Sequence, residues 1–455
     1  MTLSHEFVRL HKSLTYDALS GAAIEAAKAR CMDYLGALAG GINGPLARPM
    51  LREQAAAPCS PPESSVLATP LRAPCATAAL LNGITGHTLE LDDGDRRSYG
   101  HPGVVVLSAL FPVAEALRAS GKDFLLAMTI GYEAYVRIGQ AANPGMLRRG
   151  YHSTGTAGAL AAALAVSSVR GFDTDAMLGA LGIAGLCASG LCISLRKACE
   201  LKPFSAGRAA YNGVVAAEMV ALGLAGADDI LEGKDGFFQA YSGQEADPAV
   251  LLAPLGSPFA VEGSYIKFYP ACRYTHAPID AALALRDKVV LDDVEKIIIT
   301  TYPTAISLTA KDTLPADAAS TRFNMGFGVA LALAQGKVSM SDFCAEKAAD
   351  PLIAAMFSKI RYQEDPTLDS IKNNVRGAEM EIICKDGTRA SIRVPLPVGE
   401  PENPAPAERY RQKFMDLSRD VWSGPRQRAI LERIAHLEEL EHVTELTDLL
   451  RPDRQ

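Results

Sequence analysis

The segment from His87 to His101 places several carboxylates between two imidazoles, within a region that is otherwise rich in alanine and glycine; these acids are Glu90, Asp92, Asp93 and Asp95. If residues 78–93 form a helix, His87 and Glu90 share one face, and so do Glu90 and Asp93, because residues three apart are neighbours on a helix. Acids grouped this closely repel one another, so their pKa values should be shifted, which makes them candidates for proton transfer. The alternative is a solvated helix end that runs into a loop.

His152 marks a second place with possible chemistry. It precedes Ser153 and Thr154, either of which could cap a helix over residues 157–169. The free N–H groups and positive dipole end of that helix would favour a carboxylate or phosphate beside the imidazole. The alternative is an ordinary capped helix with a surface histidine.

Two further segments combine cations with a helix start. Lys202 and Arg208 lie in a basic stretch that leads into a helix over 206–221, with Ser205 as its cap, and they could hold an anion. A second set falls within ten residues at the entry to a differently patterned region, namely Lys267, Cys272, Arg273 and His276. A domain junction is a common place for a binding cleft. The plainer alternatives are a solvated basic loop, a lysine whose stem packs on apolar surface and a histidine that caps a helix.

These residue types indicate acid–base chemistry without a metal or a cofactor. No HxxxH or HExxH spacing occurs, and neither does the GxGxxG pattern of a Rossmann fold or the GxSxG elbow of a hydrolase. Lysines and a helix N-terminus would bind the carboxylates of a small polycarboxylate. A histidine or carboxylate would remove a proton beside one of them, and a lysine would stabilise the developing enolate-like charge.

The composition fits a globular protein with a large core and excludes some partners. The chain is 48% hydrophobic and 21% charged, with a formal net charge of −7 and no local Lys/Arg cluster, which argues against a nucleic-acid surface. Nine scattered cysteines without CxxC indicate reduced thiols in a cytoplasmic protein. The uncharged runs 150–169 and 176–195 are too rich in Ala, Gly and Ser for membrane spans, so we expect them to be central helices.

Apolar spacing in the first 263 residues predicts helices, among them 22–38, 76–93, 104–119, 124–140 and 173–195. Beyond them lie a β-branched run at 294–302 and two alternating runs, 380–384 and 390–394, around Asp386–Gly387, which suits a type I′ hairpin turn. A Pro-rich linker and closing helices, including 427–450, follow. We therefore predict a mainly α protein with a large all-helical domain, residues 1–264 and 405–455, and an inserted α+β domain, residues 265–404.

Four motifs resemble the MmgE/PrpD family, in the family's order. They are the run from His87 to Asp93 with His101-Pro102-Gly103, residues 150–156 around His152, residues 202–210 beginning with Lys202, and residues 267–272 beginning with Lys267. The likeness runs over roughly residues 7–396. It implies a large helical domain, a smaller α+β lid domain with a cleft between the two, and commonly a homodimer. Glu90, Asp93, His101, His152, Lys202 and Lys267 would then be catalytic, and His87, Arg208, Cys272, Arg273 and His276 would bind substrate.

The resemblance implies metal-independent reactions on small di- or tricarboxylates. The first expectation is dehydration of a 2-methylcitrate-like substrate, then epimerisation of a dicarboxylate such as iminodisuccinate, then decarboxylation of cis-aconitate, with a catalytically silent binding protein as the remaining alternative. Four departures from the family pattern bear on this ranking, and one of them is the segment 94–100, which differs from the best-known dehydratase pattern. Glu90 stands where many members have aspartate, Cys272 where the decarboxylase pattern has histidine, and Phe327 where many members have tyrosine.

Overall fold

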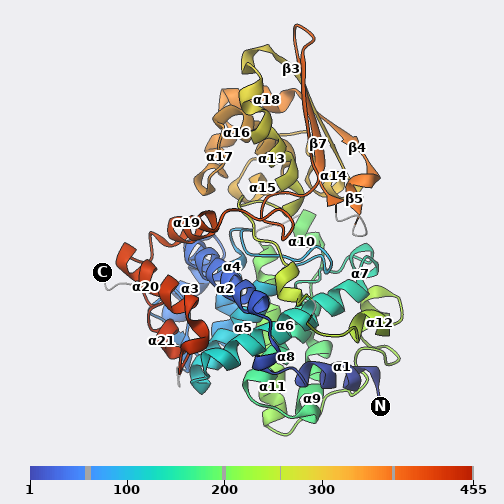
Figure 1. Cartoon of the computed structure of the whole chain (residues 1–455), viewed down its shortest axis with the longest axis vertical. Helices are drawn as coiled ribbons and strands as arrows, with labels where there is room; N and C mark the ends of the chain where they lie inside the picture. Colours follow the sequence, from blue (N-terminus) through green and yellow to red (C-terminus); the bar gives the residue numbers. More distant parts are fainter. Residues whose placement is uncertain (57–62, 197–200, 257, 371–374, 453–455) are drawn as a thin grey trace. The chain divides into compact units, whose positions relative to one another are not determined.

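The computed structural model describes residues 1–56, 63–196, 201–256, 258–370 and 375–452. The chain divides into two compact units. The first unit comprises residues 1–266 and 406–455, and the second unit comprises residues 267–405. Figure 1 gives the order of the elements along the chain.

The first unit is helical apart from the short pair of strands β1 (Ser64–Ser65) and β2 (Arg72–Ala73). Its helices are α1 (Leu3–Lys12), α2 (Gly21–Gly41), α3 (Ala47–Ala56), α4 (Cys75–His87), α5 (Pro102–Leu117), α6 (Gly121–Ala142), α7 (Gly145–Arg148), α8 (Ala157–Val169), α9 (Thr174–Cys187), α10 (Ile193–Arg196), α11 (Lys202–Ala221), α12 (Pro248–Leu251), α19 (Ala407–Ser418), α20 (Gly424–Ala435) and α21 (Thr444–Thr447). The predicted all-helical character of this part of the chain is confirmed.

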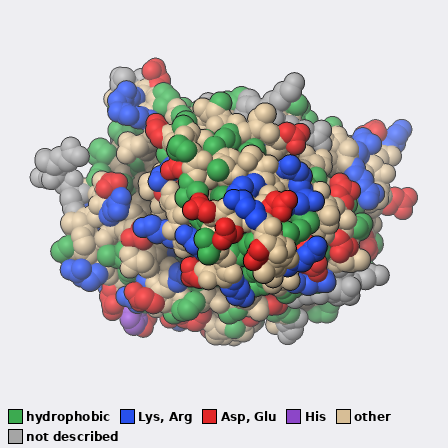
Figure 2. Space-filling model, turned by 90° about the horizontal axis from the view of Figure 1, so that it is seen from above, with side chains coloured by type: hydrophobic (Ala, Val, Ile, Leu, Met, Phe, Trp, Pro, Cys, Tyr) green, Lys and Arg blue, Asp and Glu red, His purple; other side chains and the backbone are tan. Residues whose placement is uncertain are grey.

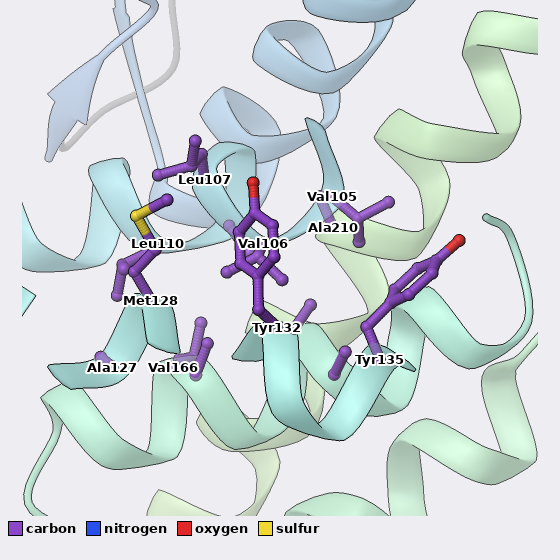
Figure 3. Close-up of a cluster of buried hydrophobic side chains, with 14 of the residues drawn as sticks. Val105, Val106, Leu107, Leu110, Ala127, Met128, Tyr132, Tyr135, Val166 and Ala210 are labelled. Atoms are coloured by element: carbon purple, nitrogen blue, oxygen red, sulfur yellow. The ribbon is translucent and has the colours of Figure 1, made fainter. Parts of the chain in front are cut away.

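The core of the first unit forms around α5, α6 and α8. Most residues of α5 and α8 are buried, which accounts for their continuous apolar runs, since a helix surrounded by other helices has no polar face. Figure 3 shows aliphatic side chains of α5, α6 and α8 packed around the rings of Tyr132 and Tyr135, which α6 contributes. The hydroxyl groups of Tyr132 and Tyr135 are thereby held at the edge of an apolar core.

Helices α4 and α11 cross at very short range. A Cβ atom added to Gly83 would lie 2.6 Å from the Cα of Gly207, and one added to Gly207 would lie 2.4 Å from the carbonyl oxygen of Leu80. Glycine at both positions permits this approach because neither carries a side chain. The crossing brings the start of α11, with Lys202, close to the chain that follows α4.

Several predicted helix ends are wrong. The helix expected over 76–93 ends at His87, and Glu90 follows with φ of +55°. That left-handed conformation costs roughly 1–2 kcal/mol for a residue with a side chain, and it cannot continue a right-handed helix. His87, Glu90 and Asp93 therefore do not share a helix face.

Three other helices also differ from the predictions. The helix expected over 206–221 begins at Lys202, so Ser205 lies inside it instead of capping it. The helix expected over 173–195 is interrupted at residues 188–192, because backbone groups there bond to the loop before α8: the Cys192 N–H donates to the Gly150 oxygen and the His152 N–H to the Gly190 oxygen. The helix expected over 427–450 ends at Ala435 and resumes only as α21.

The second unit is an α+β structure, as predicted. Its helices are α13 (His276–Leu285), α14 (Pro303–Thr309), α15 (Ala318–Thr321), α16 (Met325–Gln335), α17 (Ala345–Ala348) and α18 (Pro351–Ser358). A four-stranded sheet has the order β4 (Ile360–Glu364), β3 (Val294–Thr301), β7 (Ala378–Cys384) and β8 (Arg389–Val394), with β3 and β4 parallel and the other pairs antiparallel; β5 (Asp369–Ser370) pairs with β6 (Val375–Arg376). Helices lie on one side of the sheet in Figure 1.

The hairpin between β7 and β8 exists, but its turn is not type I′. That turn requires positive φ at both central residues. Among the described residues with positive φ, Gly387 appears at +83° and Asp386 does not, and the Cys384 N–H donates to the Thr388 oxygen. The turn is therefore of type I, closed by a glycine bulge. The Asp386 carboxylate accepts from the Thr388 N–H, a bond that favours this geometry.

The surface and the cysteines agree with the composition. On the face drawn in Figure 2, basic and acidic side chains are interspersed. Within the described ranges, no helix has the length and apolar character needed to cross a bilayer. Each cysteine that the structure describes is a free thiol.

Candidate active site

His101 lies at the N-cap of α5 and is fixed from several directions. Its backbone N–H donates to the hydroxyl oxygens of Tyr135 (3.0 Å) and Thr154 (3.3 Å), which lie on α6 and in the loop before α8. Its ring Nδ1 lies 2.8 Å from the carbonyl oxygen of Asp93 and 3.1 Å from a carboxylate oxygen of Asp92. Both of these neighbours are acceptors, so Nδ1 carries a hydrogen and Nε2 is the basic nitrogen when the ring is neutral.

Asp92 joins the two imidazoles of the motif. Its carboxylate accepts from Nδ1 of His87 at 2.8 Å and lies 3.1 Å from Nδ1 of His101. Burial acts to raise the pKa of Asp92, but the positive charges and hydrogen bonds of His87 and His101 hold that pKa well below its usual value. Asp92 is therefore an anion, and it acts only as an acceptor.

Asp92 is one of the grouped acids of the sequence motif, but it is not among the residues predicted to be catalytic or to bind substrate. A helix that continued through residue 93 would place Asp92 on a face away from His87. The actual chain leaves the helix after His87 and turns at Glu90, so that Asp92 comes back to His87.

Lys202 approaches this network from the first turn of α11. Its ammonium forms an ion pair with the carboxylate of Glu90, and its Nζ lies 3.5 Å from Nε2 of His101. The Glu90 carboxylate is also 3.6 Å from Nε2 of His87. All these side chains are buried. The left-handed backbone at Glu90 aims its carboxylate at Lys202, which the predicted helix would not have done.

Asp93 is buried and has a different set of partners. It accepts hydrogen bonds from the Tyr132 hydroxyl (2.8 Å) and from the Gly103 N–H (3.0 Å) at the start of α5. Burial raises the pKa of Asp93 to about 7, and the nearby charges of Asp92 and Asp33 act in the same direction. The structure thus brings Asp93 to the network, where it holds the first turn of α5 and hence the ring of His101.

His152 lies in the loop before α8. Burial lowers its pKa well below the usual value, and the positive charges of Lys202, His101 and His87 lower it further, so its imidazole is neutral. Nε2 lies 3.4 Å from the Thr154 hydroxyl oxygen, and Nδ1 is buried without a hydrogen-bond partner. An unpaired buried nitrogen is costly, which marks it as a place where a ligand could bind.

The predicted caps of α8 are wrong. The N-cap of this helix is Thr156, and no side chain caps it. The Ser153 hydroxyl instead accepts from the Asn143 amide, and the Thr154 hydroxyl serves His101 and His152. The loop residues are thus used to position the two imidazoles.

Arg208 is not brought to this network. It lies six residues after Lys202 on α11, which corresponds to another face of the helix, and its side chain is exposed. Its guanidinium lies over the ring of Tyr211, at 5.1 Å from the ring centre. The predicted pairing of Lys202 with Arg208 around one anion finds no support in this geometry.

Two of the predicted residues of the second unit, Arg273 and His276, have partners within that unit. Arg273 donates to the buried carboxylate of Glu400 at 2.8 Å, and its other guanidinium nitrogen lies 3.1 Å from Nδ1 of His276. Nε2 of His276 is 3.1 Å from the Ala271 oxygen. Lys267 is fully buried at the start of this unit, and Cys272 is a half-buried free thiol. Arg273 and His276 thus fix the chain around residues 271–276 and 397–400, and their predicted contact with substrate stays a prediction.

One group in the described part of the chain has the composition of a metal site. His87, Asp92 and His101 each offer a ligand atom, and these atoms lie within 4.8 Å of one another. The spacing of these three residues along the sequence does not indicate a metal site, because only the turn at Glu90 brings them together. Asp92 already shares hydrogens with both rings, and the Lys202 ammonium lies 3.5 Å from the other nitrogen of His101. The donors and the neighbouring cation fit a proton-sharing network better than a cation site.

The arrangement can remove and return protons beside a bound anion. It contains an imidazole base backed by a carboxylate, an ammonium group paired with a second carboxylate, and a neutral imidazole with one unsatisfied nitrogen. A base, a cation and a neutral donor that are held rigidly in a buried site are the groups needed to stabilise charge that develops next to a carboxylate.

Comparison with known proteins gives consistent results over most of the chain. Residues 5–249 match the model of the MmgE/PrpD N-terminal domain, and residues 269–439 match that of the MmgE/PrpD C-terminal domain. The chain is 26% identical to human cis-aconitate decarboxylase over 397 residues, which cover 84% of this chain and 80% of the human protein. It is also 26% identical to cis-aconitate decarboxylase of Aspergillus terreus, with 82% and 80% covered, and 25% identical to that of Mus musculus, with 84% and 79% covered.

Proposed function

This chain belongs to the MmgE/PrpD family, and on that premise we propose that it is a lyase that acts on a small di- or tricarboxylate by acid–base chemistry. One observation carries the proposal: the Asp92-supported ring of His101 presents Nε2 at 3.5 Å from the ammonium of Lys202, in a buried site. The names of its relatives, which are lyases, support the same class.

For the reaction itself we propose elimination of water from a hydroxy polycarboxylate of the 2-methylcitrate type. Nε2 of His101 takes the proton from the carbon next to a carboxylate, and the freed electron pair forms the carbon–carbon double bond as the carbon–oxygen bond breaks. The leaving hydroxyl takes a proton from the Lys202–Glu90 pair and departs as water. The Lys202 charge stabilises the carboxylate that gains enolate character.

His152 would contribute as a neutral hydrogen-bonding group. Its pKa is held well below the usual value, so it is a weak base and does not compete with His101 for the substrate proton. A neutral imidazole can donate a hydrogen bond to a developing oxyanion without adding a second positive charge beside Lys202. The unpaired Nδ1 is the nitrogen available for that bond.

The second candidate is decarboxylation, because the named relatives are cis-aconitate decarboxylases. In that reaction the bond to the departing CO2 breaks, its electron pair remains on carbon, and the Lys202–Glu90 pair supplies the proton to that carbon. Decarboxylation needs an acid but no base for a carbon-bound proton. Elimination and epimerisation need both an acid and a base. The Asp92 carboxylate behind His101 supports a base, and it therefore favours these two reactions over decarboxylation.

A single assay distinguishes these reactions. Purified protein is incubated with a panel of hydroxy-, unsaturated and imino-di- and tricarboxylates in heavy water and followed by proton NMR. Elimination yields an alkene, decarboxylation yields a product one carbon shorter, and epimerisation yields deuterium exchange without loss of either group. Loss of turnover in His101→Ala, with an unchanged unfolding transition, completes the test. Failure to convert any compound, or full activity of His101→Ala, would reject the proposal.

We further propose that the chain acts as a homodimer. Apolar side chains near the end of α9, before α10 and at the start of α11 are exposed, among them Leu186, Leu191, Ile193 and Phe204. Exposed apolar side chains that group together often mark a protein contact. Light scattering after size exclusion should give twice the chain mass, and Phe204→Asp should shift the protein toward the monomer.

A further inference from the structure

Two buried residues stand behind the proposed base, and the mechanism described above gives neither of them a contact with substrate. His87 is fully buried and Asp92 nearly so. Both nevertheless belong to the hydrogen-bonded group that ends at His101, with His87 on one side of the Asp92 carboxylate and His101 on the other.

We propose that Asp92 and His87 are positioning residues that set the tautomer and the basicity of His101. The inference rests on the proposed function, since it assigns His101 as the base. Asp92 holds the hydrogen of His101 on Nδ1, which leaves the lone pair of Nε2 directed toward Lys202 and the substrate. His87 donates to the same carboxylate and moderates how strongly that carboxylate favours the protonated ring.

The geometry assigns opposite effects to the two residues. A carboxylate on Nδ1 stabilises the imidazolium that forms when Nε2 takes a proton, and so raises its basicity. A second donor on the same carboxylate withdraws part of that negative charge. The distances are similar, 2.8 Å from His87 and 3.1 Å from His101, so the carboxylate is shared between the two rings.

Other charged groups surround Asp92, His87 and His101, and the test variants must leave these groups unchanged. The charge of Asp92 acts on Asp33, and both Asp92 and Asp33 act on Asp93 together with Arg30. Lys413 pairs with Asp33 and donates to the Leu91 oxygen. On the substrate side, Lys202 and Glu90 lie next to His101 and His87, and His152 senses all four of these groups. Variants restricted to residues 87 and 92 leave these groups in place.

Asp92→Asn tests the first half of the proposal. Nδ1 of His87 lies 2.8 Å from one carboxylate oxygen of Asp92 and Nδ1 of His101 lies 3.1 Å from the other, so an amide in the same place turns its donating NH2 group toward one imidazole, which must change tautomer. We expect kcat to fall by about 10²–10⁴-fold, as for other carboxylates that orient a catalytic histidine. KM should change by less than about threefold, because no substrate contact is lost.

His87 allows a matched pair of variants. His87→Asn keeps an N–H near the place of Nδ1, and kcat should fall by less than about tenfold. His87→Leu removes the donor and leaves the whole carboxylate to His101. We therefore expect the pKa of the base to fall in Asp92→Asn and to rise in His87→Leu, and the acid limb of kcat/KM to move to lower and to higher pH respectively.

The decisive experiment measures His101 itself by NMR of ¹⁵N-histidine-labelled full-length protein, with signals assigned through His101→Gln. The wild type should show a hydrogen on Nδ1, and the two variants should show pKa shifts of opposite sign. His11→Gln, at another buried histidine of the first unit, serves as the control and should leave His101 unchanged. Shifts of the same sign, or none, would overturn the inference. Because this readout needs no turnover, a protein that converts no polycarboxylate would refute the proposed function alone.

Discussion

Two buried clusters of this protein contain similar residue types but differ in how their polar atoms are paired. In the second unit, Arg273 bonds to Glu400 and contacts His276, whose other nitrogen faces the Ala271 oxygen, so both nitrogens of that ring have partners. In the first unit, Nε2 of His87 and Nδ1 of His152 are buried without hydrogen-bond partners.

The difference shows how a structural cluster and a candidate catalytic cluster can be separated. A satisfied polar group stabilises the fold, whereas an unsatisfied buried nitrogen costs stability and can be satisfied by a ligand. The pKa values agree with this distinction. Those of Asp92, Asp93 and His152 are shifted in different directions within one site, a pattern that separates acids from bases.

The largest contrast should come from replacing one histidine in each cluster. His101→Gln should lower kcat by about 10³-fold, because general base catalysis typically contributes 10²–10⁴-fold. His276→Gln should keep kcat within about threefold per folded molecule and reduce stability instead. Steady-state kinetics and urea unfolding of both variants make the test. Comparable losses of kcat in the two variants would show that the second cluster also serves the reaction.

Arg273→Met should produce the largest loss of stability. It leaves the buried carboxylate of Glu400 without its guanidinium partner, and breaking a buried pair on one side costs about 3–5 kcal/mol. The double variant Arg273→Met with Glu400→Leu should recover much of that free energy of unfolding, since no uncompensated charge remains. A single variant as stable as the wild type would contradict the structural role.

Asp93→Asn should change how stability depends on pH. The pKa of Asp93 is raised to about 7 in the folded protein, so the native state holds that proton more tightly than the unfolded chain. Its contribution to stability is complete below about pH 4, the usual range of an aspartate, and is lost as pH rises through about 7. The variant should therefore gain stability relative to the wild type over this window, by up to about 1.4 kcal/mol per pH unit.

Urea unfolding of Asp93→Asn and the wild type at pH 5 and pH 8 measures this effect. Asparagine can accept from the Gly103 N–H and donate to the Tyr132 oxygen, so the contacts of α5 are retained. His152 is present in both proteins, so its own effect cancels in the difference. A difference that does not vary with pH would mean that Asp93 is ionised in the folded state.

The smallest effect is expected from Arg208→Ala. Its exposed guanidinium lies over the ring of Tyr211 on α11, and it is on another face of the helix than Lys202, so kcat/KM should change by less than about twofold. Lys202→Ala, six residues earlier on the same helix, should lower kcat/KM by several hundredfold or more, because the buried cation is lost. A large loss in Arg208→Ala would extend the site to the exposed face of α11.

Turnover should also survive chelators, with kcat unchanged after dialysis against EDTA. The cluster of His87, Asp92 and His101 already shares its hydrogens, and Lys202 opposes a second cation nearby. A loss of activity that one divalent metal restores would instead identify that cluster as a metal site.

The sequence alone determined the helical and α+β character of the two parts of the chain and most of the residues that gather around His101. Apolar spacing is local information, and it located α2, α5, α6 and α8 and the strands β3, β7 and β8 to within a few residues. The chemical types of Glu90, His101, His152 and Lys202 were likewise readable without coordinates.

Only the tertiary structure decided which of these residues meet and what each of them does. The left-handed backbone at Glu90 ends α4 early, brings Asp92 to His87 and His101, and turns Asp93 toward α5. The glycine crossing of α4 and α11 brings Lys202 to Glu90 from more than a hundred residues away. Neither event follows from local periodicity, because a single backbone dihedral and a contact between distant helices are fixed by packing.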